Sequence, residues 1–295
     1  METLKQKIAL FLIKLIGVLP LSTARGLGSF IGGIGWLVKE RNSKVTLENL
    51  AICFPDMNRK SRTNLAKRSI KCTGALAAET FVIWHRSNRW REQHVKHIHN
   101  EHFMVDAVNL GRGVILLAPH IGNWEFLGAQ LSKYGNVTCL YQPPKQGYLE
   151  HFVVKNRAQV GMQSAPTNRK GVAMLLAALK QKGILGILPD QCPDQGGEFS
   201  PFFNTPAYTM TLVHGLIMRT QCRVVAGVAQ RVSNGFELHF IAPPESIYSE
   251  TQSESLAAMN KTVEMCIAIC PEQYQWEYKR FKVEPGGTYH RYQFN

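Results

Sequence analysis

Residues 114–134 read VILLAPHIGNWEFLGAQLSKY, and this stretch decides the fold that the sequence predicts. Its apolar start, residues 114–118, is bounded by Gly113 and Pro119, and its length and composition are typical of a buried parallel strand. An amphipathic run follows, with Asn123 as the expected N-cap of a helix and Gly135 as its expected end. The polar turn between such a strand and helix is a usual place for chemistry in an α/β domain.

His120 and Glu125 flank this turn, and we predict that they are the catalytic residues. A tight turn can bring the carboxylate onto the imidazole, where it would fix the tautomer and stabilise the imidazolium. His120 would then act as a directed general base. The plainer interpretation is a surface turn whose first-turn carboxylate is favoured by the helix dipole. The strand, the proline before the histidine and the Gly-Asn turn together favour a functional site.

The chain beyond this unit continues to alternate between strands and helices. Strands are expected at 137–141 and 184–188, and helices at 147–160, 172–182 and 254–269. This alternation predicts right-handed crossovers and a mixed, mostly parallel sheet flanked by helices, an α/β fold. Ser233-Asn-Gly235 lies between two strand-like runs and predicts a hairpin that adds an antiparallel element. Upstream, residues 42–110 are largely helical in pattern, with Ser61 as the expected cap of a helix that ends near Trp84.

Composition limits the classes of protein that the chain can belong to. Its 295 residues can bury a full core, and 45% hydrophobic with 19% charged residues exclude global disorder. Lys and Arg number 34 against 21 Asp and Glu, a net charge of +13, which favours polyanionic partners such as an anionic membrane or an acidic protein. Seven scattered cysteines argue against a disulfide framework and for a reducing compartment.

Residues 1–40 are the most membrane-like part of the sequence. One apolar run, Ile8–Leu21, is short for a membrane span and is interrupted by Lys14; a second, Gly26–Val38, is rich in glycine. Basic residues bracket both runs, so we expect a helical hairpin that lies on or dips into a bilayer. The alternative is a packed helical subdomain. The expected division is therefore a membrane-associated segment at 1–40 and a catalytic domain at 41–295.

Four histidines between residues 94 and 102 suggest a zinc site, namely His94, His97, His99 and His102. No cysteine lies close, and the sequence shows no paired second motif of ligands. A solvated strand at a sheet edge is the favoured interpretation. We therefore predict no metal site and no cofactor.

Several motifs resemble those of bacterial lipid A biosynthesis acyltransferases, the lauroyl and myristoyl transferases that use acyl carrier protein. His120-x4-Glu125 matches the HX4(D/E) signature of the wider lysophospholipid-type acyltransferases, and Pro119-His-Ile-Gly-Asn-Trp-Glu125 is similar to the more specific lipid A form. Further matching blocks, spread over residues 40–285, are Asn42-Ser-Lys-Val45, Glu48-Asn-Leu50, Pro189-Asp-Gln191, Phe199–Ala207 and Tyr278-Lys-Arg-Phe281. Asn204 stands where the family usually has glycine, and asparagine tolerates the left-handed conformation that such a turn needs.

The resemblance also implies substrate-binding residues. An arginine at the place of Arg169 is among the family's functional residues, and Arg169 precedes a helix whose first amides favour anions. Asp190 lies at the end of a strand, on the catalytic edge of an open sheet. We add Asn123 and Arg157 as binding candidates, although a solvated helix-end charge is the favoured interpretation of Arg157. Backbone N–H groups near Asn123 are expected to meet the oxyanion.

The function that this resemblance implies is transfer of a fatty acyl chain from acyl-acyl carrier protein to a hydroxyl of a Kdo-bearing lipid A precursor. The expected location is the cytoplasmic face of the bacterial inner membrane, with acyl carrier protein, the lipid precursor and the anionic membrane surface as partners, and no nucleic acid. One alternative is an acyl-CoA-dependent acyltransferase for another glycolipid or lysophospholipid. The other is a non-catalytic membrane-binding or nucleic-acid-binding protein without an assembled His–carboxylate pair.

Overall fold

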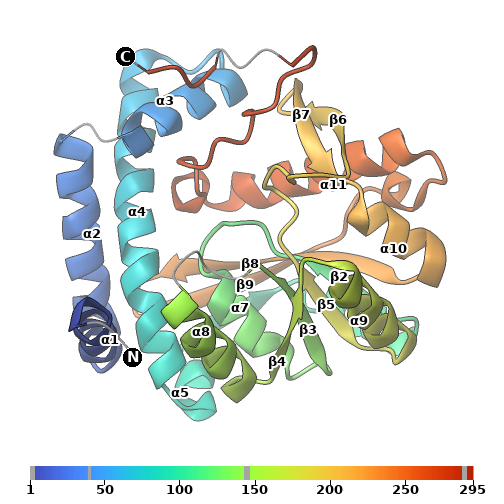
Figure 1. Ribbon diagram of the computed structural model, residues 1–295, viewed down its shortest axis with the longest axis horizontal. Coiled ribbons are helices and arrows are strands. Elements are labelled where there is room, and N and C mark those ends of the chain that lie inside the picture. The colour runs from blue at the N-terminus through green and yellow to red at the C-terminus, as the bar shows by residue number, and fades with distance from the viewer. Residues whose placement is uncertain (1–3, 39–40, 143–146, 288–290, 295) are drawn as a thin grey trace.

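The computed structural model describes residues 4–38, 41–142, 147–287 and 291–294. A seven-stranded sheet in the order β1-β9-β8-β2-β5-β3-β4 forms its centre (Figure 1). The strands are β1 (Val95–His99), β2 (Val114–Leu117), β3 (Val137–Tyr141), β4 (Met162–Pro166), β5 (Ile184–Ile187), β8 (Arg223–Val232) and β9 (Gly235–Ile241). A separate hairpin consists of β6 (Gly197–Phe202) and β7 (Thr205–Met210).

Helices pack on both faces of the sheet and extend away from it on one side (Figure 1). They are α1 (Leu4–Gly17), α2 (Leu21–Leu37), α3 (Arg41–Cys53), α4 (Arg59–His85), α5 (Asn88–Gln93), α6 (His102–Asn109), α7 (Trp124–Leu131), α8 (Gly147–Gln159), α9 (Arg169–Lys180), α10 (Leu212–Thr220) and α11 (Gln252–Ile269). The predicted α/β class with a mostly parallel, helix-flanked sheet is confirmed.

The sheet is parallel everywhere except between β8 and β9. In its middle, β2 pairs in parallel with both β5 and β8, so that Leu117 lies beside Ile187 and Ala226. The predicted hairpin is present, because β8 and β9 pair in an antiparallel manner around a turn in which Asn234 has a φ of 54°. The carboxyl ends of β2 and β5 therefore meet at one edge, directly before the turns that follow them.

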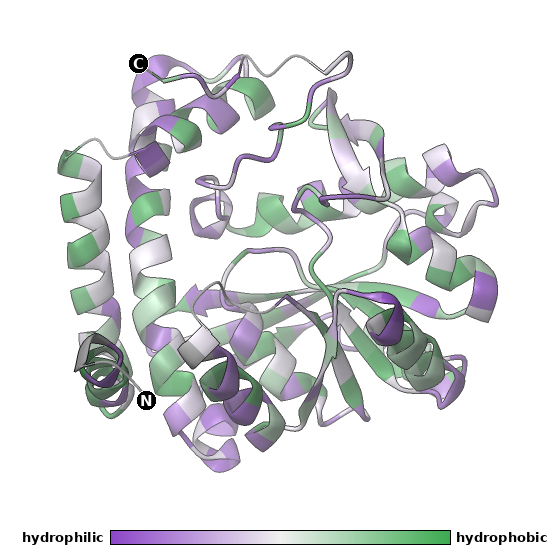
Figure 2. Ribbon diagram, viewed as in Figure 1, coloured by the Kyte–Doolittle hydropathy of each residue, from purple (hydrophilic) through white to green (hydrophobic). Residues whose placement is uncertain are grey.

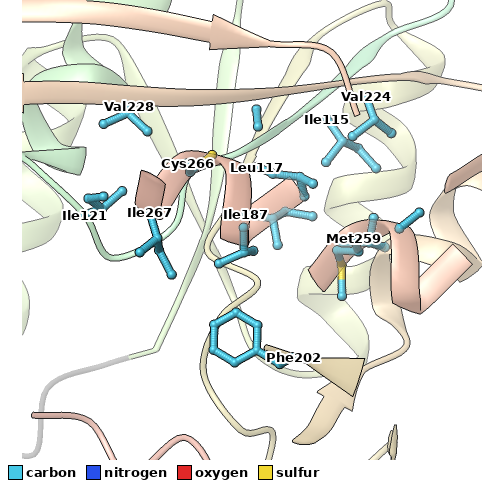
Figure 3. Packing of buried hydrophobic residues seen from close by; sticks show 14 of the residues in the cluster. Ile115, Leu117, Ile121, Ile187, Phe202, Val224, Val228, Met259, Cys266 and Ile267 are labelled. Carbon is cyan, nitrogen blue, oxygen red and sulfur yellow. The ribbon is translucent and has the colours of Figure 1, made fainter. Parts of the chain in front are cut away.

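Alternate residues of the central strands feed two cores, one on each face of the sheet. Val114 and Leu116 point to the side covered by α6 and α7, where Phe126 is fully buried. Ile115 and Leu117 point to the opposite side, covered by α9, α10 and α11 (Figure 3). Because both faces are buried, the strands are continuous apolar runs.

The N-terminal residues form two helices, α1 and α2, separated by Pro20; each packs mainly against α4 and not against the other, so the expected hairpin is not formed. Within the described part of the chain, no helix combines the length and the apolar character that crossing a bilayer requires. Hydrophobic residues recur along α2 (Figure 2), and several apolar side chains of α1 and α2 are exposed. Those more than half exposed include Phe11 (64%), Val18 (62%), Phe30 (67%), Ile31 (58%) and Leu37 (74%).

The inner side of α2 packs tightly against α4. A Cβ atom built on Gly28 would lie 2.2 Å from the carbonyl oxygen of Gly74, and one on Gly32 would lie 2.5 Å from that of Ile70. Only glycine allows two helix backbones to approach so closely. The glycines of this apolar run therefore mark a helix–helix contact with the rest of the protein.

One local prediction is wrong, one strand was not predicted, and one turn is as expected. The cap of α4 is Asn58, whose side chain accepts a hydrogen bond from the Ser61 N–H at 2.9 Å; Ser61 itself is already in the helix. Strand β4 was not expected, because its sequence, MQSAP, lacks an apolar run. The phenylalanine-rich segment forms the β6–β7 hairpin, with Asn204 in the left-handed conformation at φ 59°, as its substitution for glycine suggested.

Candidate active site

The turn that carries His120 is held by backbone contacts from two other parts of the chain. Gly122 has φ +61° and donates its N–H to the Gln273 carbonyl oxygen at 3.1 Å, and the His120 carbonyl oxygen accepts from the Gln275 N–H at 3.0 Å. On the other side, the Asn123 N–H donates to the Ala229 carbonyl oxygen at 2.9 Å. A Cβ on Gly122 would lie 2.1 Å from that same oxygen, so only glycine fits. The turn is thereby fixed between β8 and the segment after α11.

Asp190 is the carboxylate that holds His120. His120 Nδ1 lies 2.9 Å from Asp190 Oδ1, and the His120 backbone N–H donates to Oδ2, also at 2.9 Å. Burial alone would raise the pKa of Asp190, but the His120 charge and these hydrogen bonds outweigh it and lower that pKa. The ionised carboxylate accepts the Nδ1 proton, so the proton-accepting nitrogen of the neutral ring is Nε2. With the ring 16% exposed, Nε2 is poised as a general base.

Two further side chains contact the imidazole. The amide nitrogen of Gln191 lies 3.2 Å from Nε2, and the Trp124 ring packs edge-on with its centroid 4.9 Å from that of His120. The Gln191 amide can donate to the Nε2 lone pair until a substrate hydroxyl replaces it. The N–H groups of Trp124 and Glu125, at the start of α7, have no acceptor among the described residues. Free amides at a helix start suit a developing oxyanion.

The expected contact between Glu125 and His120 is not what the structure shows. Glu125 instead forms a two-point ion pair with Arg157, in which Nε lies 3.2 Å from Oε2 and Nη2 bonds Oε1. The Trp84 indole N–H also donates to Oε2, at 3.3 Å. Asp190, and not Glu125, contacts the His120 imidazole because β2 and β5 are neighbours and their carboxyl ends lie side by side. Helix α7 instead directs the Glu125 side chain toward Arg157 on α8.

Arg157 is correspondingly not a solvated helix-end charge. Its side chain is 15% exposed, and its guanidinium carbon lies 5.2 Å from the centroid of the Tyr141 ring. Burial alone would lower the pKa of Arg157, but the Glu125 carboxylate outweighs it and raises that pKa. Arg157 is therefore held in its charged form beside the Glu125 carboxylate.

An apolar cavity opens beside this ion pair. It has a volume of about 30 Å³ and runs between β2, β3, β5 and α7, with Leu131, Leu140 and Met162 among its lining residues. Glu125 and Arg157 lie at its polar border, and Gly128 and Gly186 keep its walls close to the backbone. Charged groups at the mouth and hydrocarbon inside suit a molecule with a polar head and an alkyl chain.

Arg169 is in a different position. It is exposed at the start of α9, and no hydrogen bond or ion pair to it occurs within the described ranges. α9 follows β4, which is three strands away from β2 in the sheet, about 14 Å at the usual strand spacing. The structure thus brings Arg157, and not Arg169, to the Glu125 side of the site. A binding role for Arg169 stays a prediction.

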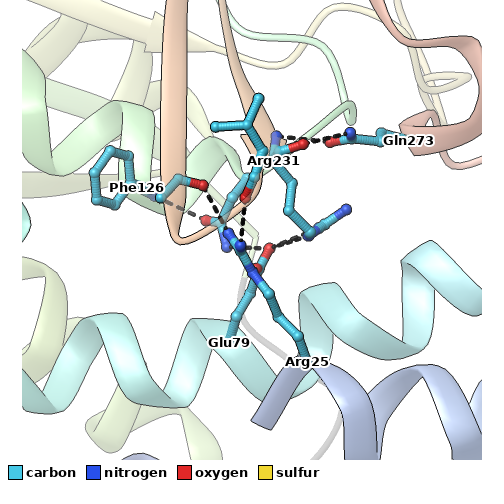
Figure 4. A network of polar contacts seen from close by, with 8 residues as sticks. Arg25, Glu79, Phe126, Arg231 and Gln273 are labelled. Atoms are coloured by element: carbon cyan, nitrogen blue, oxygen red, sulfur yellow. Dashed lines mark hydrogen bonds and ion pairs between the residues drawn. The ribbon is translucent and has the colours of Figure 1, made fainter. Parts of the chain in front are cut away.

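Asn123 links the turn to a buried ionic cluster. It caps α7 as predicted, with Oδ1 accepting from the Phe126 N–H at 2.8 Å, and its Nδ2 donates to Glu79 Oε1 at 3.0 Å. Glu79 is fully buried on α4 and pairs with Arg25 at 2.6 Å and with Arg231 at 2.6 Å (Figure 4). Burial would raise the pKa of Glu79, but the two guanidinium groups and Asn123 lower it. Helix α2, which carries Arg25, is thereby connected to the catalytic turn.

Sequence reasoning missed four of these side chains: Trp84, Gln191, Glu79 and Arg231. Gln191 lay inside a motif that had been singled out, so its place beside Asp190 was a usable signal. The others come from α4 and β8, and no spacing in the sequence connects them to residue 120. Among the described residues, the His, Cys, Asp and Glu side chains that lie close enough to share a metal ion are on β1 and β9.

Comparison with known proteins identifies what the chain resembles. A family model described as bacterial lipid A biosynthesis acyltransferase matches residues 3–283. The lipid A biosynthesis lauroyltransferase of Escherichia coli K12 is 28% identical over 94% of this chain and 91% of its own length. The palmitoleoyltransferase of the same organism is 26% identical over 91% of this chain and 88% of its own, and a Haemophilus influenzae lipid A biosynthesis acyltransferase is 24% identical over 90% and 86%.

Proposed function

Because the chain belongs to the family of bacterial lipid A biosynthesis acyltransferases, we propose that it moves a fatty acyl chain from acyl carrier protein to a hydroxyl of a Kdo-bearing lipid A precursor. The observation that carries this proposal is the buried Asp190 holding His120 Nδ1, which leaves Nε2 as a base, while Trp124, whose ring packs on His120, lines an apolar cavity. A hydroxyl acceptor needs such a base, and a fatty acyl donor needs such a cavity.

In the proposed reaction, His120 Nε2 removes the proton from the acceptor hydroxyl as its oxygen attacks the thioester carbonyl. The Trp124 and Glu125 amides stabilise the resulting oxyanion. When the tetrahedral intermediate collapses, the carbon–sulfur bond breaks and the leaving thiolate takes the proton from the imidazolium. Asp190 stays ionised throughout and stabilises that imidazolium. No acyl-enzyme is needed, because the thioester is already activated.

The Glu125–Arg157 pair has a binding role in this scheme. It borders the cavity, so the acyl chain enters past it while the thioester remains at the polar mouth. The cavity has room for about one water molecule, so the alkyl chain must displace a flexible wall residue. Met162 is that residue, since thioether side chains adapt easily and its sulfur packs over Gly128.

We also propose that the enzyme works at the cytoplasmic face of the inner membrane. Two features support this: the exposed apolar side chains of α1 and α2, and a basic hollow of about 580 Å³ on α4 lined by Lys67, Arg68 and Lys71. Apolar side chains would enter the lipid, and the cations would meet anionic headgroups or the acidic carrier protein.

Purified protein with a Kdo-bearing lipid A precursor and a ladder of acyl carrier protein thioesters tests the proposal, with products identified by mass spectrometry. We expect one added acyl chain and a strong preference for one donor length. His120→Ala is the matched inactive control. Faster transfer from acyl-CoA than from the carrier-linked donor would replace the proposal by the acyl-CoA alternative, and acylation only of a lysophospholipid would replace the acceptor.

A further inference from the structure

The edge of the sheet carries a cluster of histidines that the acyl-transfer site does not use. His99 on β1 and Glu237 and His239 on β9 each offer one ligating atom, and these three atoms lie within 4.8 Å of one another. All three side chains are partly exposed. The histidine-rich segment lacked a second ligand motif in the sequence, and β9 supplies that motif in three dimensions.

A register shift in β1 creates this arrangement. Val95 pairs with Phe236, but His97 pairs with Glu237 and His99 with His239, so Lys96 is an extra residue in β1. If the pairing continued without this shift, His97 would fall beside Leu238 and His99 beside Phe240, and both would face the core, because a one-residue slip turns each side chain to the other face. Bulges of this kind commonly re-aim side chains at functional sites.

Contacts within the cluster resemble those of metal-binding histidines. His99 Nε2 lies 2.8 Å from Glu237 Oε2, so a nitrogen and a carboxylate oxygen already converge. His239 Nε2 lies 2.9 Å from Gln230 Oε1, and because a carbonyl oxygen only accepts, Nε2 carries the proton and Nδ1 is free to bind. A polar partner that fixes the tautomer in this way is the usual outer contact of a ligating histidine.

The imidazole rings of the cluster lie close together. The rings of His99 and His239 stack with centroids 4.2 Å apart and an interplanar angle of 7°, and His97 packs against His99 at 4.2 Å. Imidazoles crowded beside one carboxylate are suitable ligands for a divalent ion.

We propose that His99, Glu237 and His239 form a binding site for a divalent transition-metal ion of the zinc class, which fastens the edge strand β1 to β9. Two imidazoles and one carboxylate are a common zinc set with an open position for water. Ligating atoms around tetrahedral zinc lie about 3.3 Å apart, so small rotamer changes from the present arrangement are enough. Hard ions such as Mg²⁺ prefer oxygen ligands and are not expected to bind.

Titration of chelator-treated full-length protein with Zn²⁺ alone tests this site, by calorimetry and by thermal unfolding. We expect one equivalent to bind and the melting temperature to rise by about 3 °C or more at saturating Zn²⁺. His239→Ala and Glu237→Gln should each weaken binding by at least about tenfold. Glu237→Gln is nearly isosteric, so it keeps the test valid if the alanine variant folds poorly.

His102→Ala is the matched control, because His102 is an exposed histidine outside the cluster, and its binding should equal that of the wild type. Equal Zn²⁺ affinity and stoichiometry in the wild type and His239→Ala would overturn the proposal and leave only adventitious binding to scattered histidines. An equal temperature shift with Mg²⁺ would overturn it as well. Acyl transfer is not the readout, so the result is independent of the proposed enzymatic function.

Discussion

Two buried carboxylates of this protein, Glu79 and Glu125, look alike locally and differ in what surrounds them. Each pairs with arginine, and each side chain is 7% exposed or less. Glu79 has both oxygens bound by Arg25, Arg231 and Asn123, inside a sealed contact between α2, α4 and β8. Glu125 stands at the border of a cavity, beside the turn that carries His120. Burial and pairing with arginine therefore do not identify a functional site. What marks the site at Glu125 is the adjoining cavity and a reactive group, His120, whose Nε2 can still accept a proton.

The largest effect of this difference is expected at the reactive group itself. His120→Ala should lower turnover by about two to four powers of ten, because it removes the base. Asp190→Asn should impair the same step, and the double variant should be little worse than either single one, since the two act as a unit. Steady-state rates with circular dichroism check this. Losses that multiply would separate Asp190 from the base.

The buried cluster around Glu79 should affect the stability of the fold and not the rate of the reaction. Glu79→Gln leaves two buried guanidinium groups uncompensated, so the free energy of unfolding should fall by about 3–5 kcal/mol. The folded-state pKa of Glu79 lies below its ordinary 4.5, so its ionised form stabilises the fold above that pH. This contribution is lost as the pH falls through the lowered pKa. The difference in the free energy of unfolding between the wild type and Glu79→Gln should therefore narrow in that pH range.

Urea unfolding at several pH values measures that gap. Glu92→Gln is a suitable control, since the Glu92 side chain is 54% exposed and its carboxylate lies 4.0 Å from the Lys133 ammonium group. An equally large loss in Glu92→Gln would mean that net charge, and not the cluster, determines stability.

A smaller effect is expected where the ion pair borders the cavity. Arg157→Lys keeps the charge but loses the two-point contact with Glu125, and it should reduce kcat/KM by about tenfold or more. Arg169→Ala should stay within about threefold of wild type, because Arg169 is solvated and remote. Donor titrations of both variants provide the test. The reverse order would restore Arg169 as the functional arginine.

The smallest effect should come from the outer side of α2, the helix whose inner side supplies Arg25. Phe30→Ser removes a side chain that is 67% exposed, so stability should change by less than about 0.5 kcal/mol. Binding to anionic vesicles should weaken by about tenfold, if the ring enters the lipid. Co-sedimentation measures this, with Phe199→Ser, an exposed phenylalanine on β6, as the control. Equal losses of vesicle binding in both variants would contradict a membrane-binding face on α2.

The sequence predicted the local features of the site well and its long-range contacts poorly. The strand, the turn, the Asn123 cap and the β8–β9 hairpin follow from patterns within a few residues, and all are present. The sequence could not predict that Asp190, and not Glu125, contacts the His120 imidazole, because that contact depends on β2 lying beside β5. The burial of Arg157 could not be predicted for the same reason. Its partner, Glu125, comes from another helix, and an arginine at a helix end does not by itself indicate burial.

The backbone contacts of the catalytic turn have a consequence for biosynthesis. Residues 120 and 122 bond to Gln275 and Gln273, which come much later in the chain. On a ribosome, the turn would emerge long before the segment that fixes it. We therefore expect the base to be assembled only after that segment has also emerged, so that shorter nascent chains, whose N-terminal helices could already reach a lipid surface, remain inactive there.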